Sequence, residues 1–346
     1  MIIEAISKIV ERIDLEPEEA RLVMEEIMSG EATSAQIAAF LTGLRMKGET
    51  VEEIVSFVTA MLRHASVISP QVDGVMVDTC GTGGDRIKTF NISTISAFVS
   101  AGAGIAVAKH GNRAVSSKAG SADVLEALGL NIMLEPEQVR ACIETIGMGF
   151  MFAPVFHPAM KYALGPRKEI GIRTVFNILG PLANPAKVQT QVVGVYDVAL
   201  VEKIANVLAG LGVRRAIVAH GLDGLDEISP IGETIIAELK DGKITTYRIA
   251  PEDFGLERAR VSEIEGGDVE ENARIAIEIL KGRRGAKRDA VLMNAAAALV
   301  VGGLVEDLKE GFELASLSID SGKAYRKLVD LVRFRGDESR LERFNR

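Results

Sequence analysis

The chain has 346 residues, a formal net charge of −8 and a sequence pI near 5.3. This length predicts two domains, and the acidic charge argues against a nucleic-acid binder that works through a broad basic face. Hydrophobic residues make up 47% and charged residues 25%, as in ordinary soluble globular proteins. Cys80 and Cys142 form no C-x-x-C pair, so neither a zinc site nor a disulfide framework is indicated.

The N-terminus shows no basic leader, and Glu4 interrupts the apolar start Met1-Ile2-Ile3. No stretch of the sequence approaches the roughly 20 uncharged apolar residues of a membrane span. We therefore expect a cytoplasmic protein that has no membrane association.

Residues 1 to about 68 show the spacing and punctuation of four helices. Thr33 and Thr50 each begin a capping box, the pattern that starts a helix. This bundle contains no convergent chemistry, so we expect it to serve as an interface or a lid. The turn-rich segment Ser69–Gly74 then marks the end of a first domain, residues 1–70.

The stretch Val75–Arg113 organises the rest of the chain. An apolar strand leads into the glycine turn Gly81–Asp85, and a helix starts after Asn91. A second strand, Ile105–Ala108, then leads into a polar loop that begins with Lys109. Glycines let backbone N–H groups converge on a ligand, and the first turn of a helix attracts phosphate. This order of elements indicates an anion site at the carboxyl edge of a sheet.

Two familiar phosphate-binding motifs do not fit this glycine turn. Arg86 stands where the dinucleotide fingerprint needs a third glycine, and Asp85-Arg86 stands where a Walker A loop needs Lys followed by Ser or Thr. A glycine cluster by itself is more often a plain turn. However, a second polar loop, Ser116–Ser121, precedes another helix, Ala122–Leu128. Two helix N-termini at one strand edge favour a phosphate site.

The middle of the chain interrupts the alternation of strands and helices. We expect a short strand at Asn131–Met133, a helix at 136–146 and further helices over about 157–187, where Gly180-Pro181 is a strong breaker. These last helices should pack back against the N-terminal bundle and join that domain. Arg167 is either an ordinary surface cation or an arginine placed between two domains to hold a carboxylate bidentately.

The alternation resumes at Val192 and includes a buried strand, Ala216–Ala219, followed by Asp226-Glu227. Adjacent carboxylates beyond a strand form either a charged turn or a site for a hard cation such as Mg²⁺, which also binds phosphate oxygens. The phosphate site predicted at the same edge favours the metal. Thr234–Ile249 predicts an antiparallel hairpin around a D-G turn, and Asp289–Leu299 predicts a buried helix.

On these motifs, the chain resembles the anthranilate phosphoribosyltransferase family over nearly its whole length. The motifs are GTGGD at 81–85, TFNIST at 89–94, KHGNRAVSSKAGSADVLEALG at 109–129, HPAM at 157–160, GIRTVFNILGPLANP at 171–185 and DEISP at 226–230. The resemblance implies an α/β protein with a small N-terminal helical domain and a larger α/β domain, 71–156 and 188–346, with a central, mostly parallel sheet. It also implies an active site in the cleft between the domains and a homodimer, usually formed through the helical domain.

The resemblance also assigns the site residues. The positions that match those binding phosphoribosyl pyrophosphate are Gly81, Thr82, Gly84, Asp85, Thr89, Asn91, Ser93, Thr94, Lys109 and Ser121. The positions that match the anthranilate side are Gly81, His110, Asn112 and Arg167, with Arg167 on the carboxylate. The positions that match the Mg²⁺ ligands are Ser93, Asp226 and Glu227.

The implied activity is transfer of the phosphoribosyl group of 5-phosphoribosyl-1-pyrophosphate to the amine of anthranilate, with release of pyrophosphate. This is the second step of tryptophan biosynthesis from chorismate. The Mg²⁺ ligands and Lys109 would stabilise the negative charge that develops on the leaving group. No residue stands out as an obligatory base, so positioning and leaving-group stabilisation should supply most of the acceleration.

The chain departs from the family pattern in two places, and two other functions stay open. Arg86-Ile87-Lys88 stands where many relatives have a small, glycine-containing segment, and Ala119 replaces a serine. A pyrimidine-nucleoside phosphorylase shares the architecture, although Asp226-Glu227 and the KHGN motif favour the transferase. A non-catalytic relative that binds nucleic acid is disfavoured by the acidic net charge.

Overall fold

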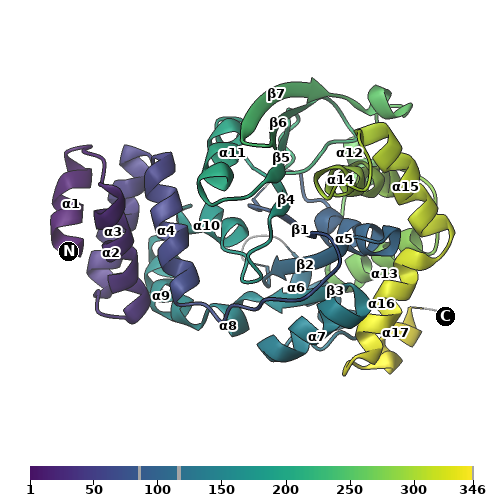
Figure 1. Ribbon diagram of the computed structural model, residues 1–346, viewed down its shortest axis with the longest axis horizontal. Coiled ribbons are helices and arrows are strands. Elements are labelled where there is room, and N and C mark those ends of the chain that lie inside the picture. The colour runs from purple at the N-terminus through teal and green to yellow at the C-terminus, as the bar shows by residue number, and fades with distance from the viewer. Residues whose placement is uncertain (85–86, 115–117, 345–346) are drawn as a thin grey trace.

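The computed structural model describes residues 1–84, 87–114 and 118–344. In Figure 1 a helical bundle, drawn in purple, stands at one end of the molecule, beside a larger portion in which helices surround a sheet. The chain therefore has the predicted fold class, a small N-terminal helical bundle domain and a larger α/β domain.

The N-terminal bundle consists of α1 (Ile2–Val10), α2 (Pro17–Ser29), α3 (Ser34–Lys47) and α4 (Val51–Arg63). The helices predicted for this segment are thus confirmed. Both predicted capping boxes also form, because the hydroxyls of Thr33 and Thr50 accept hydrogen bonds from the backbone N–H groups of Gln36 and Glu53. Local sequence signals therefore account for where these helices begin.

Two later helices complete the bundle. α9 (Lys161–Ile170) packs on α2 and α3, and α10 (Phe176–Leu182) packs on α4. This confirms that the segment of about 157–187 returns to the N-terminal helices. The predicted breaker Gly180-Pro181 lies inside α10, which ends one residue later. A proline this close to a helix end disrupts few backbone hydrogen bonds, so the short helix tolerates it.

In the described parts of the chain, the strands form one seven-stranded sheet in the order β3-β2-β1-β4-β5-β6-β7. The strands are β1 (Met76–Gly81), β2 (Ala106–Gly111), β3 (Met148–Phe152), β4 (Thr190–Gly194), β5 (Arg215–Gly221), β6 (Thr234–Lys240) and β7 (Lys243–Ile249). The neighbours from β3 to β5 pair in parallel, and β6 and β7 add an antiparallel hairpin. The sheet is therefore mostly parallel, as predicted.

The strand predicted at Asn131–Met133 is wrong. Those residues form a turn, in which the Asn131 side-chain oxygen accepts a hydrogen bond from the Met133 N–H at 3.0 Å. The strand that pairs with β2 is instead β3, which follows α7 (Pro136–Ile146) and is buried along its whole length. Three consecutive residues with one buried apolar side chain offer too little surface to compete for that position.

The remaining helices are α5 (Ile92–Ala103), α6 (Ser121–Ala127), α8 (Ala153–Phe156), α11 (Leu200–Gly210), α12 (Val261–Ile264), α13 (Val269–Leu280), α14 (Ala286–Val301), α15 (Leu308–Asp320), α16 (Lys323–Arg333) and α17 (Glu338–Arg343), with 3₁₀ turns at Pro158–Met160 and Pro251–Phe254. α5 and α14 pack on each other and both contact β1. α14 is buried from Ala290 to Val301, which confirms the predicted buried helix. α11 contacts both β5 and α4, so it links the sheet to the bundle.

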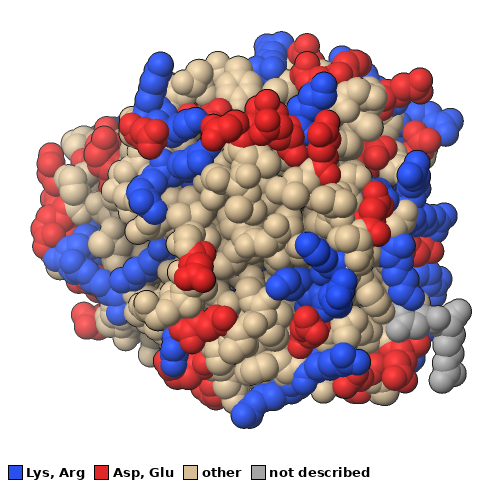
Figure 2. Space-filling model, turned by 45° about the vertical axis from the view of Figure 1, so that its right-hand side comes forward, with Lys and Arg blue, Asp and Glu red and all other residues tan. Residues whose placement is uncertain are grey.

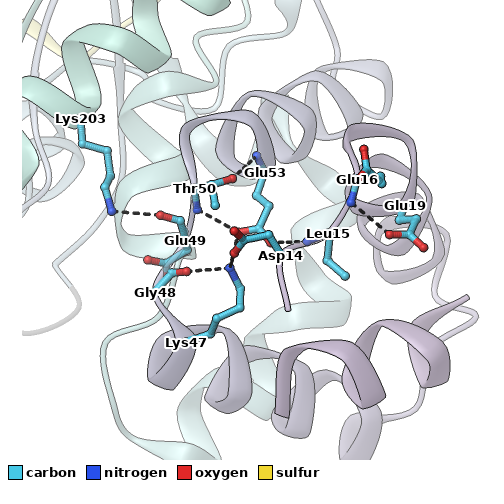
Figure 3. Close-up of polar contacts among 10 residues, drawn as sticks. All are labelled: Asp14, Leu15, Glu16, Glu19, Lys47, Gly48, Glu49, Thr50, Glu53 and Lys203. Carbon is cyan, nitrogen blue, oxygen red and sulfur yellow. Dashed lines mark hydrogen bonds and ion pairs between the residues drawn. The ribbon is translucent and has the colours of Figure 1, made fainter. Parts of the chain in front are cut away.

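A buried ion pair ties the turns of the bundle together (Figure 3). Glu53 is fully buried, and its carboxylate accepts hydrogen bonds from the N–H groups of Leu15 and Thr50, each at 2.9 Å, and from Lys47 Nζ at 3.0 Å. Close by, Lys203 of α11 donates to the carbonyl oxygen of Glu49 at 2.9 Å. The contacts fix two helix–helix connections and attach them to the α/β domain.

The surface carries charges of both signs. Figure 2 shows one face on which Lys and Arg alternate with Asp and Glu around uncharged side chains. Within residues 1–84, 87–114 and 118–344, no helix combines the length and the apolar character that a membrane crossing requires.

Candidate active site

Four parallel strands, β1, β2, β4 and β5, each end in a glycine. These ends lie at one edge of the sheet, where ligands bind in open α/β folds. Absence of a side chain is necessary there, because a Cβ atom on Gly194 would lie 1.6 Å from the Asp226 carbonyl oxygen. A Cβ atom on Gly81 would lie 2.8 Å from Asp226 Oδ2, and one on Gly111 would lie 2.3 Å from Ser121 Oγ. The glycines thus allow two loops to pack directly on the strand ends.

The glycine turn after β1 contacts the Asp226 carboxylate. Gly83 N–H donates to Asp226 Oδ2 at 2.7 Å, and both Gly83 and Gly84 have positive φ, 67° and 81°. Thr82 Oγ1 accepts a hydrogen bond from Tyr196 N–H at 3.1 Å, which holds the turn against the chain after β4. Asp85, which belongs to the predicted donor site, lies outside the described residues.

The N-terminus of α5 faces the second carboxylate. Ser93 N–H donates to Glu227 Oε1 at 3.2 Å, so an anionic group already lies at the positive end of this helix. Asn91, the residue before the helix, does not cap it with its side chain. Thr94 Oγ1 is buried and has no hydrogen-bond partner within the described part of the chain. Such a hydroxyl at a helix N-terminus is a candidate ligand for an anion.

The stretch before α5 is braced from outside the sheet. Thr89 pairs with Glu265 in an isolated antiparallel bridge. Asn91 Nδ2 donates to the Ala119 carbonyl oxygen, and Asn91 Oδ1 accepts from Asn272 Nδ2, both at 3.2 Å. Asn91 therefore joins the first polar loop to the second one and to α13.

Lys109 is buried at the end of β2, and 2% of it is exposed. Its Nζ donates to the Thr79 carbonyl oxygen at 2.6 Å. Burial lowers the pKa of Lys109, and the attraction of the Asp78 carboxylate opposes that shift. Asp78 is itself buried and accepts hydrogen bonds from Asn184 Nδ2 at 2.8 Å and from His110 N–H at 3.3 Å. The lysine charge therefore has no direct carboxylate partner within the described residues.

Two of the side chains predicted for the acceptor side, His110 and Arg167, lie against α10. The His110 ring centroid is 5.1 Å from that of His157, and burial, with repulsion from His157, lowers the pKa of His110 to about 3. His110 Nε2 is buried and has no partner in the described residues. Arg167 lies over the ring of Phe176, 5.1 Å from its centroid, and burial lowers the pKa of Arg167.

One helix relates these two groups. The Gly180 carbonyl raises the pKa of His110 somewhat against the effect of burial, so the imidazole lies against α10 at Gly180. Phe176, under Arg167, is four residues earlier on the same helix and therefore on the same face.

Asn112, in contrast, is exposed, and its side-chain oxygen accepts a hydrogen bond from Arg113 N–H at 2.8 Å. Ser121 Oγ donates to the Asn112 carbonyl oxygen at 3.3 Å.

Arg113, which follows the KHGN motif, is paired with carboxylates of α6. It forms ion pairs with Asp123 at 2.9 Å and Glu126 at 2.8 Å.

Arg173, between α9 and α10, lies at the site although sequence analysis did not identify it. Its guanidinium donates to the Gly84 carbonyl oxygen and lies 4.3 Å from the centroid of the Tyr196 ring. Arg173 thus connects the segment between α9 and α10 to the glycine turn. This contact cannot be predicted from the residues next to Arg173 in the sequence.

Asp226 and Glu227 present oxygen ligands that suit Mg²⁺. Burial raises the pKa of Asp226, and the Gly83 N–H opposes that shift; a divalent cation would also favour the charged carboxylate. The described residues contain no group of three or more His, Cys, Asp or Glu side chains that could enclose a metal. Two carboxylates with a nearby hydroxyl fit a cation that keeps waters and binds phosphate oxygens.

Comparisons with known proteins agree with this geometry. Residues 73–325 match the family model described as the a/b domain of a glycosyl transferase family, and residues 3–65 match its helical bundle domain. The anthranilate phosphoribosyltransferase of Acetivibrio thermocellus is 53% identical over 334 residues, which cover 96% of each chain.

Two solved structures extend the likeness to three dimensions. The enzyme of the same name from Thermus thermophilus superposes with a TM-score of 0.90 at 43% identity, over 95% of this chain and 98% of that one. That of Saccharomyces cerevisiae, in complex with PRPP and Mg, gives a TM-score of 0.88 at 30% identity, over 96% and 97%.

Proposed function

The chain belongs to the anthranilate phosphoribosyltransferase family, and on this premise we propose which residues carry out each part of the reaction. It is an enzyme that transfers the phosphoribosyl group of 5-phosphoribosyl-1-pyrophosphate to the amine of anthranilate and releases pyrophosphate, in tryptophan biosynthesis. The family membership favours this activity over that of a nucleoside phosphorylase or a nucleic-acid binder.

The donor is proposed to bind along the carboxyl edge of β1 and β2. The glycine turn and the N-terminus of α5 lie at this edge and attract negative charge, since Gly83 N–H and Ser93 N–H already donate to the carboxylates of Asp226 and Glu227. The residues in this role are Gly81, Thr82, Gly84, Asp85, Thr89, Asn91, Ser93, Thr94, Lys109 and Ser121. The buried hydroxyl of Thr94 and the buried ammonium of Lys109 support the assignment, because each gains a partner when an anion arrives.

Mg²⁺ is proposed to bind at Asp226, Glu227 and the Ser93 hydroxyl. When bound, the cation supplies positive charge to the pyrophosphate oxygens as they become the leaving group. The two carboxylates hold this position through Gly83 N–H and Ser93 N–H. These two contacts are the observation that carries the proposal, because they bring the carboxylates to the glycine turn and to the helix N-terminus together.

The acceptor is proposed to bind on the α10 side, in the cleft between the domains, near Gly81, His110 and Asn112. Arg167 suits the anthranilate carboxylate, because this half-buried guanidinium forms no ion pair within the described residues. His110 stays neutral at physiological pH, so it adds no positive charge next to the amine. The amine then attacks the ribose carbon, which becomes oxocarbenium-like as pyrophosphate leaves.

The assembly and the domain limits are also proposed. Residues 1–70 with about 157–187 form the helical domain, and 71–156 with 188–346 form the donor-binding domain. A homodimer through the helical domain would cover the apolar side chains Ile3, Val10 and Met46, which are 64%, 60% and 73% exposed. The expected location is the cytoplasm, without contact to membrane or nucleic acid.

A fluorescence assay for the loss of anthranilate tests the activity. The signal should fall only when both phosphoribosyl pyrophosphate and Mg²⁺ are present. Omission of either compound is the first control, and thymidine with inorganic phosphate is the second. Consumption of thymidine and phosphate, with no loss of anthranilate, would contradict the proposed roles.

A further inference from the structure

Asn294 is a polar side chain inside an apolar helix. The segment of α14 from Ala290 to Val301 is buried throughout, and Asn294 is its one polar residue in the sequence. Burying an amide costs free energy unless its hydrogen-bonding groups are paired. The hydrogen-bond partners of Asn294 therefore indicate its role.

The amide pairs with the backbone of Ile228. Asn294 Oδ1 accepts a hydrogen bond from Ile228 N–H at 2.9 Å, and Asn294 Nδ2 donates to the Ile228 carbonyl oxygen at 3.0 Å. The second Nδ2 hydrogen is directed to the Ala290 carbonyl oxygen, at 2.9 Å. The side chain thus holds both backbone groups of one residue, as a neighbouring strand would.

Ile228 directly follows Asp226-Glu227, the carboxylates of the proposed metal site. On their other side, Asp223 Oδ1 accepts a hydrogen bond from Leu225 N–H at 3.1 Å, and the Leu225 carbonyl oxygen accepts one from Gly221 N–H at 2.9 Å. The two carboxylates therefore lie between two fixed points, one on the end of β5 and the other on α14.

The same helix also positions the opposite half of the site. Ser96 Oγ of α5 donates to the Val291 carbonyl oxygen of α14 at 3.1 Å, and the N-terminus of α5 receives Glu227 through Ser93 N–H. The helix thus holds the carboxylate loop through Asn294 and the anion-binding helix through Val291 (α14 and α5 in Figure 1). If the loop that carries Asp226 and Glu227 moved relative to α14, this loop would also move relative to the N-terminus of α5.

We propose that Asn294 is a positioning residue that sets the place of Asp226 and Glu227 over the glycine turn and the α5 N-terminus, and so sets the affinity for the divalent cation and the donor pyrophosphate. This inference rests on the proposed function of those two carboxylates. Asn294 contacts neither substrate nor metal and acts through Ile228. The alternative is that it merely stabilises the core.

The test compares Asn294→Ala with Val300→Ala, which removes buried atoms from the same helix away from the loop. Three quantities are measured on the full chain: the Mg²⁺ concentration for half-maximal turnover, the KM for anthranilate, and hydrogen exchange of a peptide spanning residues 222–232 without ligands. Asn294→Ala should raise the half-saturating Mg²⁺ concentration by about tenfold or more and speed exchange in that peptide. Its KM for anthranilate should stay within about twofold of the wild-type value, and Val300→Ala should change none of these quantities.

Asn294→Ser, which retains a hydroxyl, should give an intermediate effect and replaces the alanine variant if that one does not fold. Asp226→Asn separates the two hypotheses. If Asp226→Asn loses the Mg²⁺ response while Asn294→Ala and Asn294→Ser keep the wild-type half-saturation, the positioning role is overturned and the metal site stands. If Asp226→Asn keeps the wild-type response, the metal site itself is wrong, and the inference falls with it.

Discussion

Two lysine side chains of this chain lie largely within the fold, yet their pKa values shift in opposite directions. Lys47 lies in the helical bundle with 3% of its side chain exposed, and Lys109 lies at the sheet edge with 2% of the residue exposed. Burial acts to lower the pKa of Lys47, but Asp14 and Glu53 outweigh it and raise the value. For Lys109, burial outweighs the attraction of Asp78, and the pKa is lowered.

The difference lies in the partners. Lys47 contacts Asp14 at 2.5 Å and Glu53 at 3.0 Å, so its charge is neutralised within the fold (Figure 3). Lys109 donates to a neutral carbonyl, while Asp78 is engaged by Asn184 and by His110 N–H. Because the fold gives the Lys109 ammonium no direct counterion, an anionic ligand can act as its counterion. We infer that the pair in the bundle stabilises the fold, and that the lysine at the sheet edge takes part in the proposed binding of the donor.

The sharpest test of this contrast is Lys109→Met. Loss of the ammonium should lower turnover about 10³-fold, the magnitude found when a donor to developing negative charge is removed. The free energy of unfolding should fall much less than in Lys47→Met, because the buried Lys109 cation is itself unfavourable at the sheet edge. Steady-state rates and urea unfolding measure the two quantities. Turnover within tenfold of the wild type would place Lys109 outside the reaction.

The converse variant is Lys47→Met. It leaves the Glu53 carboxylate buried without its cation, which should cost about 3–5 kcal/mol of unfolding free energy. Below the unfolding transition, kcat should stay within about twofold of the wild-type value, since the bundle pair contacts no proposed site residue. Adding Glu53→Gln to Lys47→Met should recover part of the loss. A loss of kcat that exceeds the loss of stability would show that the bundle pair also serves the reaction.

A third test concerns Arg167, a cation that is buried in part. Arg167→Ala should raise the KM for anthranilate by roughly 10–100-fold, as expected for loss of a charged hydrogen bond. Lys168→Ala, at the adjacent exposed position, is the matched control and should leave that KM unchanged. The KM for phosphoribosyl pyrophosphate should change little in either variant. An unaltered anthranilate KM in Arg167→Ala would remove this residue from the acceptor side.

Much of the fold followed from signals between near neighbours in the sequence. The capping boxes at Thr33 and Thr50 form, and the D-G hairpin turns through Asp241 and Gly242, whose φ values of 51° and 77° are those of a tight hairpin turn. The strand at Asn131–Met133 failed because pairing with β2 depends on a competing strand, β3, which lies beyond a helix. Local patterns do not specify such competition.

The residues of the candidate site also fall into those that local motifs indicated and those that only long-range contacts bring to the site. The glycine turn, the start of α5 and Asp226-Glu227 are contiguous motifs, so the sequence indicated them, and the structure brings them together. Arg173 and Asn294 act across 89 and 66 residues of chain, on Gly84 and Ile228. In the sequence Arg173 lies within the motif at 171–185 without a sign of what it contacts, and Asn294 is a lone amide in an apolar helix. Their partners become apparent only when the chain is folded.

His110 extends the comparison to a third buried basic group, one that carries no charge. Burial and His157 lower its pKa from 6.5 to about 3. Between these two values the unfolded chain binds a proton that the folded chain does not, so this group makes stability fall as pH decreases, by at most about 1.4 kcal/mol per pH unit. Urea unfolding of wild type and His110→Gln between pH 6.5 and 4.5 measures the effect.

The wild-type curve should be steeper than that of His110→Gln, and the difference should grow as the pH falls below 6.5. Some slope will remain in the variant, because burial also lowers the pKa of His157, and carboxylates begin to titrate near the lower limit. Parallel curves would mean that His110 takes up a proton in the folded state. That result would place a positive charge beside the proposed amine site, and it would remove the distinction between an uncharged His110 and a charged Lys109.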